Sequence, residues 1–251
     1  MTRAALVTGA GRRIGRTIAL ALAGAGFDVA IHYKSSRSDA ETLAQEVRSL
    51  GRRAALLPAD LREEAEVRAL APAAAAALGP LSLLVNNASV FLDDGIETLT
   101  TETWRAHLDS NLFAPVLLAQ AFAAQAAEGA LIVNLLDQRV WKPTPQFFSY
   151  SISKAALWFA TRTLAQALAP KVRVNGVGPG PTLPSIHQSH AEFEAEAAGV
   201  LLRRRATPDE IARAVLYFVE ATSVTGQMIA IDGGQHLGWR TPDVLQLEPS
   251  S

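Results

Sequence analysis

Short apolar segments alternate with longer segments of helical periodicity along nearly the whole chain, and this alternation constrains the fold more than any other feature. The spacing predicts seven strands, at residues 4–7, 28–33, 54–57, 81–85, 131–136, 172–177 and 227–231. Strands that alternate with helices pair in parallel, because each connecting helix returns the chain across one face of the sheet. The predicted fold class is therefore α/β, with a doubly wound parallel sheet and helices on both faces.

The segments between the strands predict the helices and one flap. Helical periodicity covers residues 39–50, 62–78, 101–127, 147–168 and a stretch that starts at Thr207, a hydroxyl cap followed by proline. Pro115 is expected to kink or loosen the helical turn before it. Residues 185–205 predict a polar helical segment, the core of a substrate flap at about 181–206. No linker divides the chain, so residues 1–251 are expected to form one domain.

The composition excludes several classes of protein. Hydrophobic residues make up 49% of the chain, which is enough for one sizeable core. The formal net charge of -1 provides no broad nucleic-acid surface, and the absence of cysteine excludes disulfides and thiolate metal sites. His187 and His190 lack an acidic partner, so we interpret them as loop or surface residues and expect no metal. The chain begins without the apolar stretch of a signal peptide, and polar residues interrupt 112–136, so a soluble cytoplasmic protein without membrane contact is expected.

A glycine-rich turn, T-G-A-G-R-R-I-G, joins the first predicted strand to a helix. Gly9, Gly11 and Gly15 let the backbone come close to a phosphate, and the helix start supplies free N–H groups and a positive dipole end. The turn therefore predicts a site for the phosphates of a dinucleotide. A plain tight turn is the alternative.

The residues after the second strand bear on which dinucleotide is bound. An Asp or Glu at this position binds the ribose 2′-hydroxyl of NAD, but Lys34, Ser35 and Ser36 stand here, and Arg13 adds a cation from the glycine turn. These groups suit a 2′-phosphate, so NADPH is favoured over NADH, although a solvated loop is the alternative. Asp60, after the third strand, is a candidate to accept from the adenine amino group or to cap the next helix.

The fourth strand ends in N-N-A-S, and Phe91 follows in the next loop. The small side chains of Ala88 and Ser89 allow close approach of a ligand. Open α/β sheets bind ligands at the carboxyl ends of their strands. We therefore expect this loop to contact a ligand.

Tyr150 and Lys154 lie four residues apart in a predicted helix, so their side chains project from one face. A phenol has an ordinary pKa of about 10 and is a poor acid or base at neutral pH. A nearby ammonium favours the phenolate and lowers that pKa. The pair is thus a candidate for proton transfer, and a half-buried tyrosine beside a surface lysine is the alternative.

These motifs occur in a familiar order: the glycine turn, N-N-A-S, Asn111, S-Y-S-I-S-K and N-G-V-G-P-G. Residues 3–238 thereby resemble the short-chain dehydrogenase/reductase family. The resemblance implies a single-domain Rossmann fold with a seven-stranded parallel sheet, usually assembled as a homotetramer or dimer. It implies Tyr150 as the acid, Lys154 as the group that binds the nicotinamide ribose and lowers the tyrosine pKa, and Asn111 as the holder of a proton-relay water.

Two departures from the family pattern point to one branch. The family usually has glycine at the position of Arg13 and serine at the position of Asp137. Together with H-Y-K-S-S at 32–36 and A-S-V-F at 88–91, these departures resemble the pteridine reductases and dihydromonapterin or dihydrofolate reductases. The resemblance implies that Phe91 stacks on the pterin and that Arg13 contacts both cofactor phosphate and substrate.

Asp137 also indicates the kind of bond that is reduced. In carbonyl reduction the oxygen gains negative charge, which a hydroxyl stabilises and an ionised carboxylate repels. A C=N bond instead needs a proton on nitrogen, and a carboxyl group beside Tyr150, with its pKa raised by burial, helps to deliver it. The sequence thus favours an NADPH-dependent pteridine reductase that acts on dihydrobiopterin, dihydromonapterin or dihydrofolate.

Three alternatives stay open. Asp137 is also placed to do no more than cap the segment that follows it. The protein is alternatively a generic NADP-dependent carbonyl or 3-oxoacyl reductase, or a non-catalytic NADP-binding regulator.

The predicted site residues form three overlapping groups. The catalytic residues are Asp137, Tyr150, Lys154 and Asn111. The cofactor-binding residues are Gly9, Gly11, Arg13, Ile14, Gly15, His32, Tyr33, Lys34, Ser35, Ser36, Asp60, Leu61, Asn87, Ala88, Ser89, Tyr150, Lys154, Pro179 and Gly180. The substrate-binding residues are Arg13, Ser89, Phe91, Asp137, Tyr150, Pro181 and Leu183.

Overall fold

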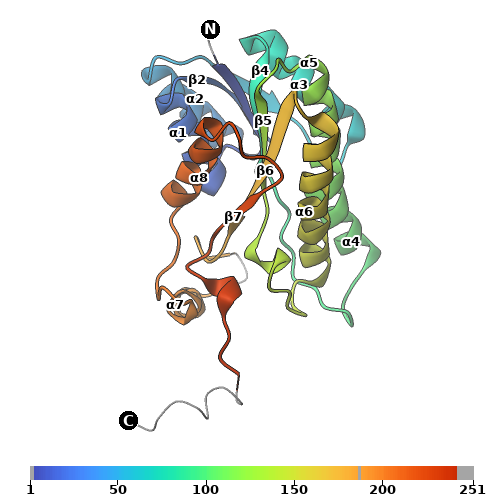
Figure 1. Ribbon diagram of the computed structural model, residues 1–251, viewed down its shortest axis with the longest axis vertical. Helices are drawn as coiled ribbons and strands as arrows, with labels where there is room; N and C mark the ends of the chain where they lie inside the picture. The colour runs from blue at the N-terminus through green and yellow to red at the C-terminus, as the bar shows by residue number, and fades with distance from the viewer. Residues whose placement is uncertain (1–2, 186–187, 242–251) are drawn as a thin grey trace.

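A computed structural model describes residues 3–185 and 188–241 (Figure 1). Its seven strands form one parallel sheet in the order β3-β2-β1-β4-β5-β6-β7, which confirms the predicted doubly wound α/β fold. The strands are β1 (Arg3–Val7), β2 (Phe27–Tyr33), β3 (Ala54–Pro58), β4 (Leu81–Asn86), β5 (Ala130–Leu135), β6 (Val172–Pro179) and β7 (Met228–Ile231). The strand order reverses direction between β1 and β4. The connections that leave the carboxyl ends of these two strands run to opposite faces of the sheet, and the crevice between them is where such sheets bind ligands.

Helices cover both faces of the sheet (Figure 1). One face carries α1 (Arg13–Gly24), α2 (Arg37–Ser49) and α8 (Pro208–Glu220), and the other carries α3 (Glu64–Leu78), α4 (Thr101–Leu108), α5 (Ala114–Gln125) and α6 (Phe148–Leu168). Successive side chains of a strand point to opposite faces, so Ala5 and Val7 of β1 join the first core while Ala4 and Leu6 join the second. Burial on both faces explains why the central strands are almost continuously apolar.

The segment predicted as one helix over 101–127 divides into α4, a π-helical turn at Asp109–Phe113 and α5. Pro115 has no N–H to donate to the carbonyl of Asn111 four residues earlier, so regular α-helical bonding cannot pass this point. The predicted loosening before Pro115 is confirmed. It places Asn111 inside the irregular turn, where it is buried.

The predicted flap contains a shorter helix than expected, α7 (His190–Gly199). It starts at a capping box in which Ser189 and Glu192 exchange hydrogen bonds, and the turns after Gly199 lead to Thr207, the predicted cap of α8. His190 is exposed, whereas His187 lies outside the described residues. Two single turns, η2 (Gln138–Val140) and η3 (Gln235–Leu237), were not expected. No helix in the described part of the chain is long and apolar enough to cross a membrane.

Candidate active site

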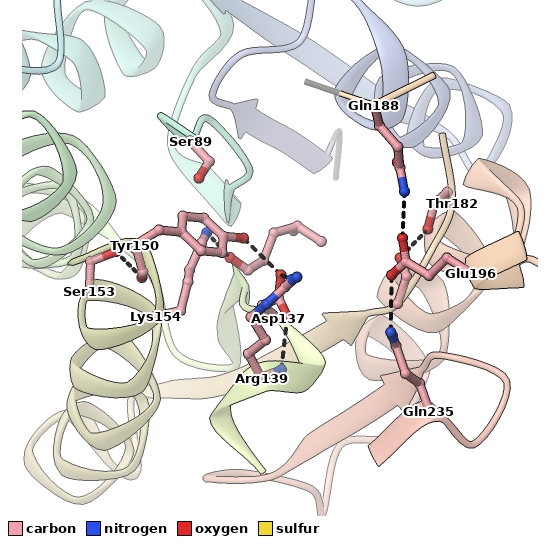
Figure 2. A network of polar contacts seen from close by, with 12 residues as sticks. Ser89, Asp137, Arg139, Tyr150, Ser153, Lys154, Thr182, Gln188, Glu196 and Gln235 are labelled. Atoms are coloured by element: carbon pink, nitrogen blue, oxygen red, sulfur yellow. Dashed lines mark hydrogen bonds and ion pairs between the residues drawn. The ribbon is translucent and has the colours of Figure 1, made fainter. Parts of the chain in front are cut away.

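A cavity of about 520 Å³ opens at the carboxyl ends of the strands. Strand ends and the starts of α1 and α6 form one wall, and α7 with η3 closes the opposite side (Figure 2). Many of the predicted site residues line it: Arg13, Ile14, Asn87, Ser89, Phe91, Asp137, Tyr150, Lys154, Pro179, Gly180, Pro181 and Leu183. The remaining predicted residues surround it or lie beyond its rim.

The glycine turn packs tightly against the end of β4. Gly9 has a positive φ of 61°, and a Cβ added at Gly15 would lie 2.3 Å from the Gly9 carbonyl oxygen and 2.5 Å from Asn87 Nδ2. Asn87 donates through Nδ2 to the Thr8 carbonyl at 2.8 Å, and the Thr8 hydroxyl accepts from the backbone N–H groups of Asn87 and Ala88. Only glycine fits at these two positions, so the turn presents bare backbone.

The His32 side chain supports this turn from beneath, and the prediction that this residue binds the cofactor stays a prediction. Gly9 donates its N–H to His32 Nδ1 at 3.0 Å, so the proton lies on Nε2, which donates to the Ala59 carbonyl at 3.1 Å. Burial lowers the pKa of His32, which favours this neutral form. Tyr33 is buried as well. Both residues therefore hold the site in place without forming its surface.

Of the two cations predicted to bind a 2′-phosphate, Lys34 lies at the end of β2, outside the main cavity that Arg13 lines. Lys34 Nζ is 2.6 Å from Asp60 Oδ2, and Arg62 pairs with the same carboxylate at 2.8 Å. These partners, Arg62 foremost, hold the pKa of Asp60 well below its usual range. Asp60 does not cap α3, whose N-cap is Glu63, but its Oδ1 accepts the Arg62 N–H in the turn before that helix.

Three other predicted residues lie in the same region. Ser35 is exposed, and the Ser36 hydroxyl would lie 2.7 Å from a Cβ added at Gly11. Leu61 is buried in the core beside α3. The glycine turn and the end of β2 are therefore neighbours, as a dinucleotide site requires.

Arg13 stands where the family usually has glycine, and its backbone explains that preference. Its φ is 53°, in the left-handed region that favours glycine. Its guanidinium donates from Nη2 to the carbonyl oxygens of Leu183 and Pro184, at 3.3 and 3.1 Å. Arg13 thus joins the glycine turn to the start of the flap while it lines the cavity.

Asp137 faces Tyr150 across the cavity wall (Figure 2). The Tyr150 hydroxyl donates to Asp137 Oδ2 at 2.9 Å, and Asp137 Oδ1 accepts the Arg139 N–H at 2.8 Å. The carboxylate therefore caps η2 with one oxygen and meets the phenol with the other. The capping alternative and the functional interpretation are both compatible with this geometry.

Burial raises the pKa of Tyr150 well above 10, and the charge and hydrogen bond of Asp137 raise it further. This corrects the prediction that Lys154 lowers it. The Lys154 ammonium lies 5.7 Å from the centre of the Tyr150 ring and donates instead to the Leu135 carbonyl at 2.8 Å. Burial lowers the pKa of Lys154 to about 8. The phenol consequently keeps its proton at neutral pH.

The Asn111 side chain is fully engaged with protein groups, and the prediction that this residue holds a proton-relay water stays a prediction. Its Oδ1 accepts from the Val90 N–H at 2.8 Å and the Ser89 hydroxyl at 3.2 Å. Its Nδ2 donates to the Val90 carbonyl at 2.9 Å and to Ser153 Oγ at 3.1 Å. Both amide protons are therefore used, and Asn111 clamps the loop that carries Phe91.

The Phe91 ring lies between two other rings. It stacks on Phe147 with centroids 4.3 Å apart and meets the edge of Tyr150 at 4.7 Å. The Arg139 guanidinium covers the Phe147 ring at 5.4 Å. This aromatic group forms the apolar part of the wall beside the Tyr150 hydroxyl.

Sequence reasoning missed two groups of residues near the cavity. Asp94, His107 and Ser149 form a buried hydrogen-bonded chain behind Phe91 and Tyr150. Glu196 of α7 accepts from Gln188 Nε2 at 2.8 Å and Gln235 Nε2 at 3.0 Å on the opposite wall (Figure 2). Neither group has a local sequence pattern, because its members come from elements distant in the chain.

Three comparisons with known proteins agree with this arrangement. A sequence-family model described as enoyl-(acyl carrier protein) reductase matches residues 9–236. The chain is 48% identical to FolM alternative dihydrofolate reductase 1 from Brucella canis, crystallised with NADP, over 96% of this chain and 97% of that one, with a TM-score of 0.93.

Two curated relatives are more distant. An uncharacterized oxidoreductase of Methylorubrum extorquens is 34% identical over 92% of this chain and 97% of its own length. The 3-oxoacyl-[acyl-carrier-protein] reductase FabG of Staphylococcus aureus is 31% identical over 94% of this chain and 99% of its own length.

Proposed function

The chain belongs to the short-chain dehydrogenase/reductase family, and we propose that it is an NADPH-dependent pteridine reductase that reduces dihydropterins to their tetrahydro forms. One observation carries the proposal. A carboxylate, not a serine hydroxyl, accepts from the Tyr150 hydroxyl at 2.9 Å in the cavity wall. The similarity to the Brucella canis dihydrofolate reductase supports the same substrate class.

The cofactor of the family branch is NADP, and the residues present fit it. Gly9, Gly11 and Gly15 suit phosphates, because a Cβ at each would crowd neighbouring protein atoms and the turn therefore presents bare backbone. Lys34, which also pairs with Asp60, and Arg13 supply the positive charge that a 2′-phosphate needs, and no acidic residue stands among residues 32–36 at the end of β2. When bound, NADPH supplies the hydride.

The chain's own residues supply the proton. Hydride adds to carbon and a proton to nitrogen, so a C=N bond becomes a CH–NH bond. Tyr150 is protonated at neutral pH, since its pKa is raised further above that of a free phenol. Its hydroxyl donates to Asp137 Oδ2, and for transfer this proton must turn from the carboxylate to the substrate nitrogen. This pair delivers the proton to the ring nitrogen, and bulk water restores it. Lys154, fixed by the Leu135 carbonyl, binds the nicotinamide ribose.

The cavity wall also suits a flat ring. Phe91 and Phe147 present apolar rings beside the Tyr150 hydroxyl, and Arg13 reaches the same space from the glycine turn. We assign Phe91, Ser89 and Arg13 to substrate, with Pro181 and Leu183 at the edge of the flap over residues 181–206. We assign Asn111 to the placement of the Phe91 loop.

The chain also has features expected of an assembled, single-domain enzyme. Phe113 and Phe159 expose about half or more of their surface beside α5 and on α6. Large exposed apolar side chains on neighbouring elements suit a contact between subunits. We therefore propose a cytoplasmic homotetramer, which light scattering coupled to size-exclusion chromatography tests directly.

A turnover assay with NADPH tests the proposed function. We expect dihydromonapterin, dihydrobiopterin or dihydrofolate to be reduced, and NADPH to be used with a higher kcat/KM than NADH. No activity on any of the three pterins, together with rapid reduction of ketones, contradicts it.

The similarity to the FabG of Staphylococcus aureus favours one competing function, a carbonyl or 3-oxoacyl reductase. The substitution Asp137→Ser separates the two, because a hydroxyl stabilises an oxyanion but supplies a weaker acid to a ring nitrogen. Under our proposal it impairs pterin reduction and leaves or improves ketone reduction. The opposite pattern favours the carbonyl reductase.

A further inference from the structure

Three buried side chains outside the cavity form one hydrogen-bonded chain. Ser149 and His107 are fully buried and Asp94 is 4% exposed. His107 Nδ1 lies 2.7 Å from Ser149 Oγ, the Ser149 hydroxyl donates to Asp94 Oδ2, and the Ser149 N–H donates to Asp94 Oδ1 at 3.1 Å. These polar groups have no part in the chemistry proposed above, yet they occupy the space behind it.

The direction of each bond fixes the proton positions. The Leu92 N–H donates to His107 Nε2 at 3.0 Å, so the imidazole proton lies on Nδ1 and is donated to Ser149. Ser149 then passes its own hydroxyl proton toward the Asp94 carboxylate. Burial lowers the pKa of His107, which keeps this neutral form. The series of hydrogen bonds is therefore continuous from the Leu92 N–H through His107 and Ser149 to the Asp94 carboxylate.

These hydrogen bonds connect the loop that carries Phe91 with the first turn of α6. Leu92 and Asp94 lie in the loop after β4, and Ser149 precedes Tyr150 in α6. On the other side of Phe91, Asn111 clamps both the N–H and the carbonyl of Val90. Alternate residues of the loop are thus pinned from behind, and the ring of the residue between them meets Tyr150 at 4.7 Å.

We propose that His107, Ser149 and Asp94 are positioning residues that set the Phe91 ring against the Tyr150 ring and so fix where a flat substrate ring lies. The kind of substrate rests on the proposed function, whereas the pinning of the loop does not. A second proton on His107 turns Nε2 into a donor, which cannot accept from Leu92. The loop then loses one of its attachments. The charged and titratable groups around His107 are Asp94, Tyr150 and Lys154.

The substitution Ser149→Ala tests the proposal, with Ser151→Ala as its matched control. The Ser151 hydroxyl lies in the same helical turn, is buried and has no hydrogen-bond partner among the described residues. Ser149→Ala removes two buried hydrogen bonds, the one from His107 and the one to Asp94. We expect it to raise the pterin KM at least about tenfold, with kcat and the Kd of NADPH nearly unchanged. Ser151→Ala should leave all three constants unchanged.

Hydrogen exchange gives a readout that does not depend on substrate. Ser149→Ala should speed amide exchange in residues 90–94 about tenfold relative to Ser151→Ala, since the Leu92 N–H is released more often. Faster exchange without a change in KM overturns the positioning role. If the unaltered protein is inactive on every pterin, the proposed function is rejected instead. The hydrogen-exchange result then decides by itself whether Ser149 holds the loop in place.

His107→Gln keeps an acceptor for Leu92 but cannot take up a proton near neutral pH. We expect it to retain the KM measured at pH 7.5 and to lose the rise in KM that the unaltered protein shows on the acid side, at a pH below the ordinary histidine range because burial lowers the pKa of His107. An acid-side rise that persists in His107→Gln contradicts the proposal. This variant also carries the test if Ser149→Ala does not fold.

Discussion

The two walls of the cavity are built differently. The wall of Asp137, Tyr150 and Lys154 lies on the end of β5 and on α6, and Tyr150 and Lys154 are 7% and 2% exposed. The opposite wall, Gln188 and Glu196 with Gln235, is held by contacts between side chains on the flap and η3 (Figure 2). The first wall has little freedom, and the second can change with little effect on the core.

The difference lies in what holds each reactive group. Lys154 donates to a backbone carbonyl of the central sheet, and Asp137 accepts from the backbone of η2. Within residues 3–185 and 188–241, Glu196 is held in place by the amides of two glutamine side chains. We therefore expect substitutions on the buried wall to change the rate of the chemical step, and substitutions on the flap wall to change which substrates are accepted.

The largest effect should come from removing the Tyr150 hydroxyl. Tyr150→Phe keeps the ring that packs on Phe91 but deletes the proton donor, so kcat should fall about 10³-fold, the usual contribution of a positioned acid. Stopped-flow measurement of NADPH oxidation gives the rate. Tyr217→Phe on α8, whose side chain is half exposed, is the control and should leave kcat unchanged. A fall in kcat of less than tenfold for Tyr150→Phe would contradict the role of Tyr150 as the proton donor.

A second prediction concerns the burial of Lys154 in the same wall, which should make the free energy of unfolding depend on pH. The pKa of Lys154 is lowered to about 8 in the folded protein, against 10.5 as its ordinary value. Between these values the unfolded chain binds more protons than the folded one, so stability rises with pH, whereas below about pH 8 no gain is present. Relative to Lys154→Met, the free energy of unfolding should rise by about 1–2 kcal/mol from pH 8 to 9.5.

Urea unfolding of both proteins at the two pH values measures this difference. Tyr150 titrates above this window in the folded protein, and its contribution is shared by both variants to a first approximation. Parallel pH dependence in the two proteins would mean that Lys154 is not buried as the structure places it.

The sequence predicts the elements of the buried wall well, because each depends on a local pattern. Tyr150 and Lys154 share a helix face by their spacing, and Asp137 follows a strand whose neighbours are known from the alternation. The prediction fails where distances across elements decide. Whether the Tyr150 pKa rises or falls depends first on how deeply the phenol is buried and then on which charged group it contacts, and the structure buries it with its hydroxyl bonded to Asp137.

The same reason explains why the sequence does not predict the hydrogen bonds of Asn111 and His32. The hydrogen-bond partners of Asn111 and His32 come from loops and strands far away in the sequence, and the residues adjacent to either one do not indicate which partners they are. Buried polar residues must find hydrogen bonds, but sequence alone does not say with which groups. The flap wall was predicted only as a polar helical segment, because its side-chain contacts depend on where α7 meets η3.

The smallest effect should come from the flap wall, through the charge of Glu196. Its carboxylate lines the cavity opposite Asp137, where the part of a substrate that extends beyond the reacting ring would lie. An anionic tail such as the glutamate of dihydrofolate meets repulsion there, whereas the hydroxyl-bearing tail of dihydromonapterin does not. For Glu196→Gln we expect kcat/KM for dihydrofolate to rise about threefold, a partly solvated charge effect, with dihydromonapterin unchanged. Glu194→Gln on the same helix, whose side chain pairs with Arg205 at 3.8 Å and lies outside the cavity, is the control. Equal changes for both substrates in Glu196→Gln would mean that the flap shapes the cavity without selecting by charge, and the contrast between the two walls would then concern mobility alone.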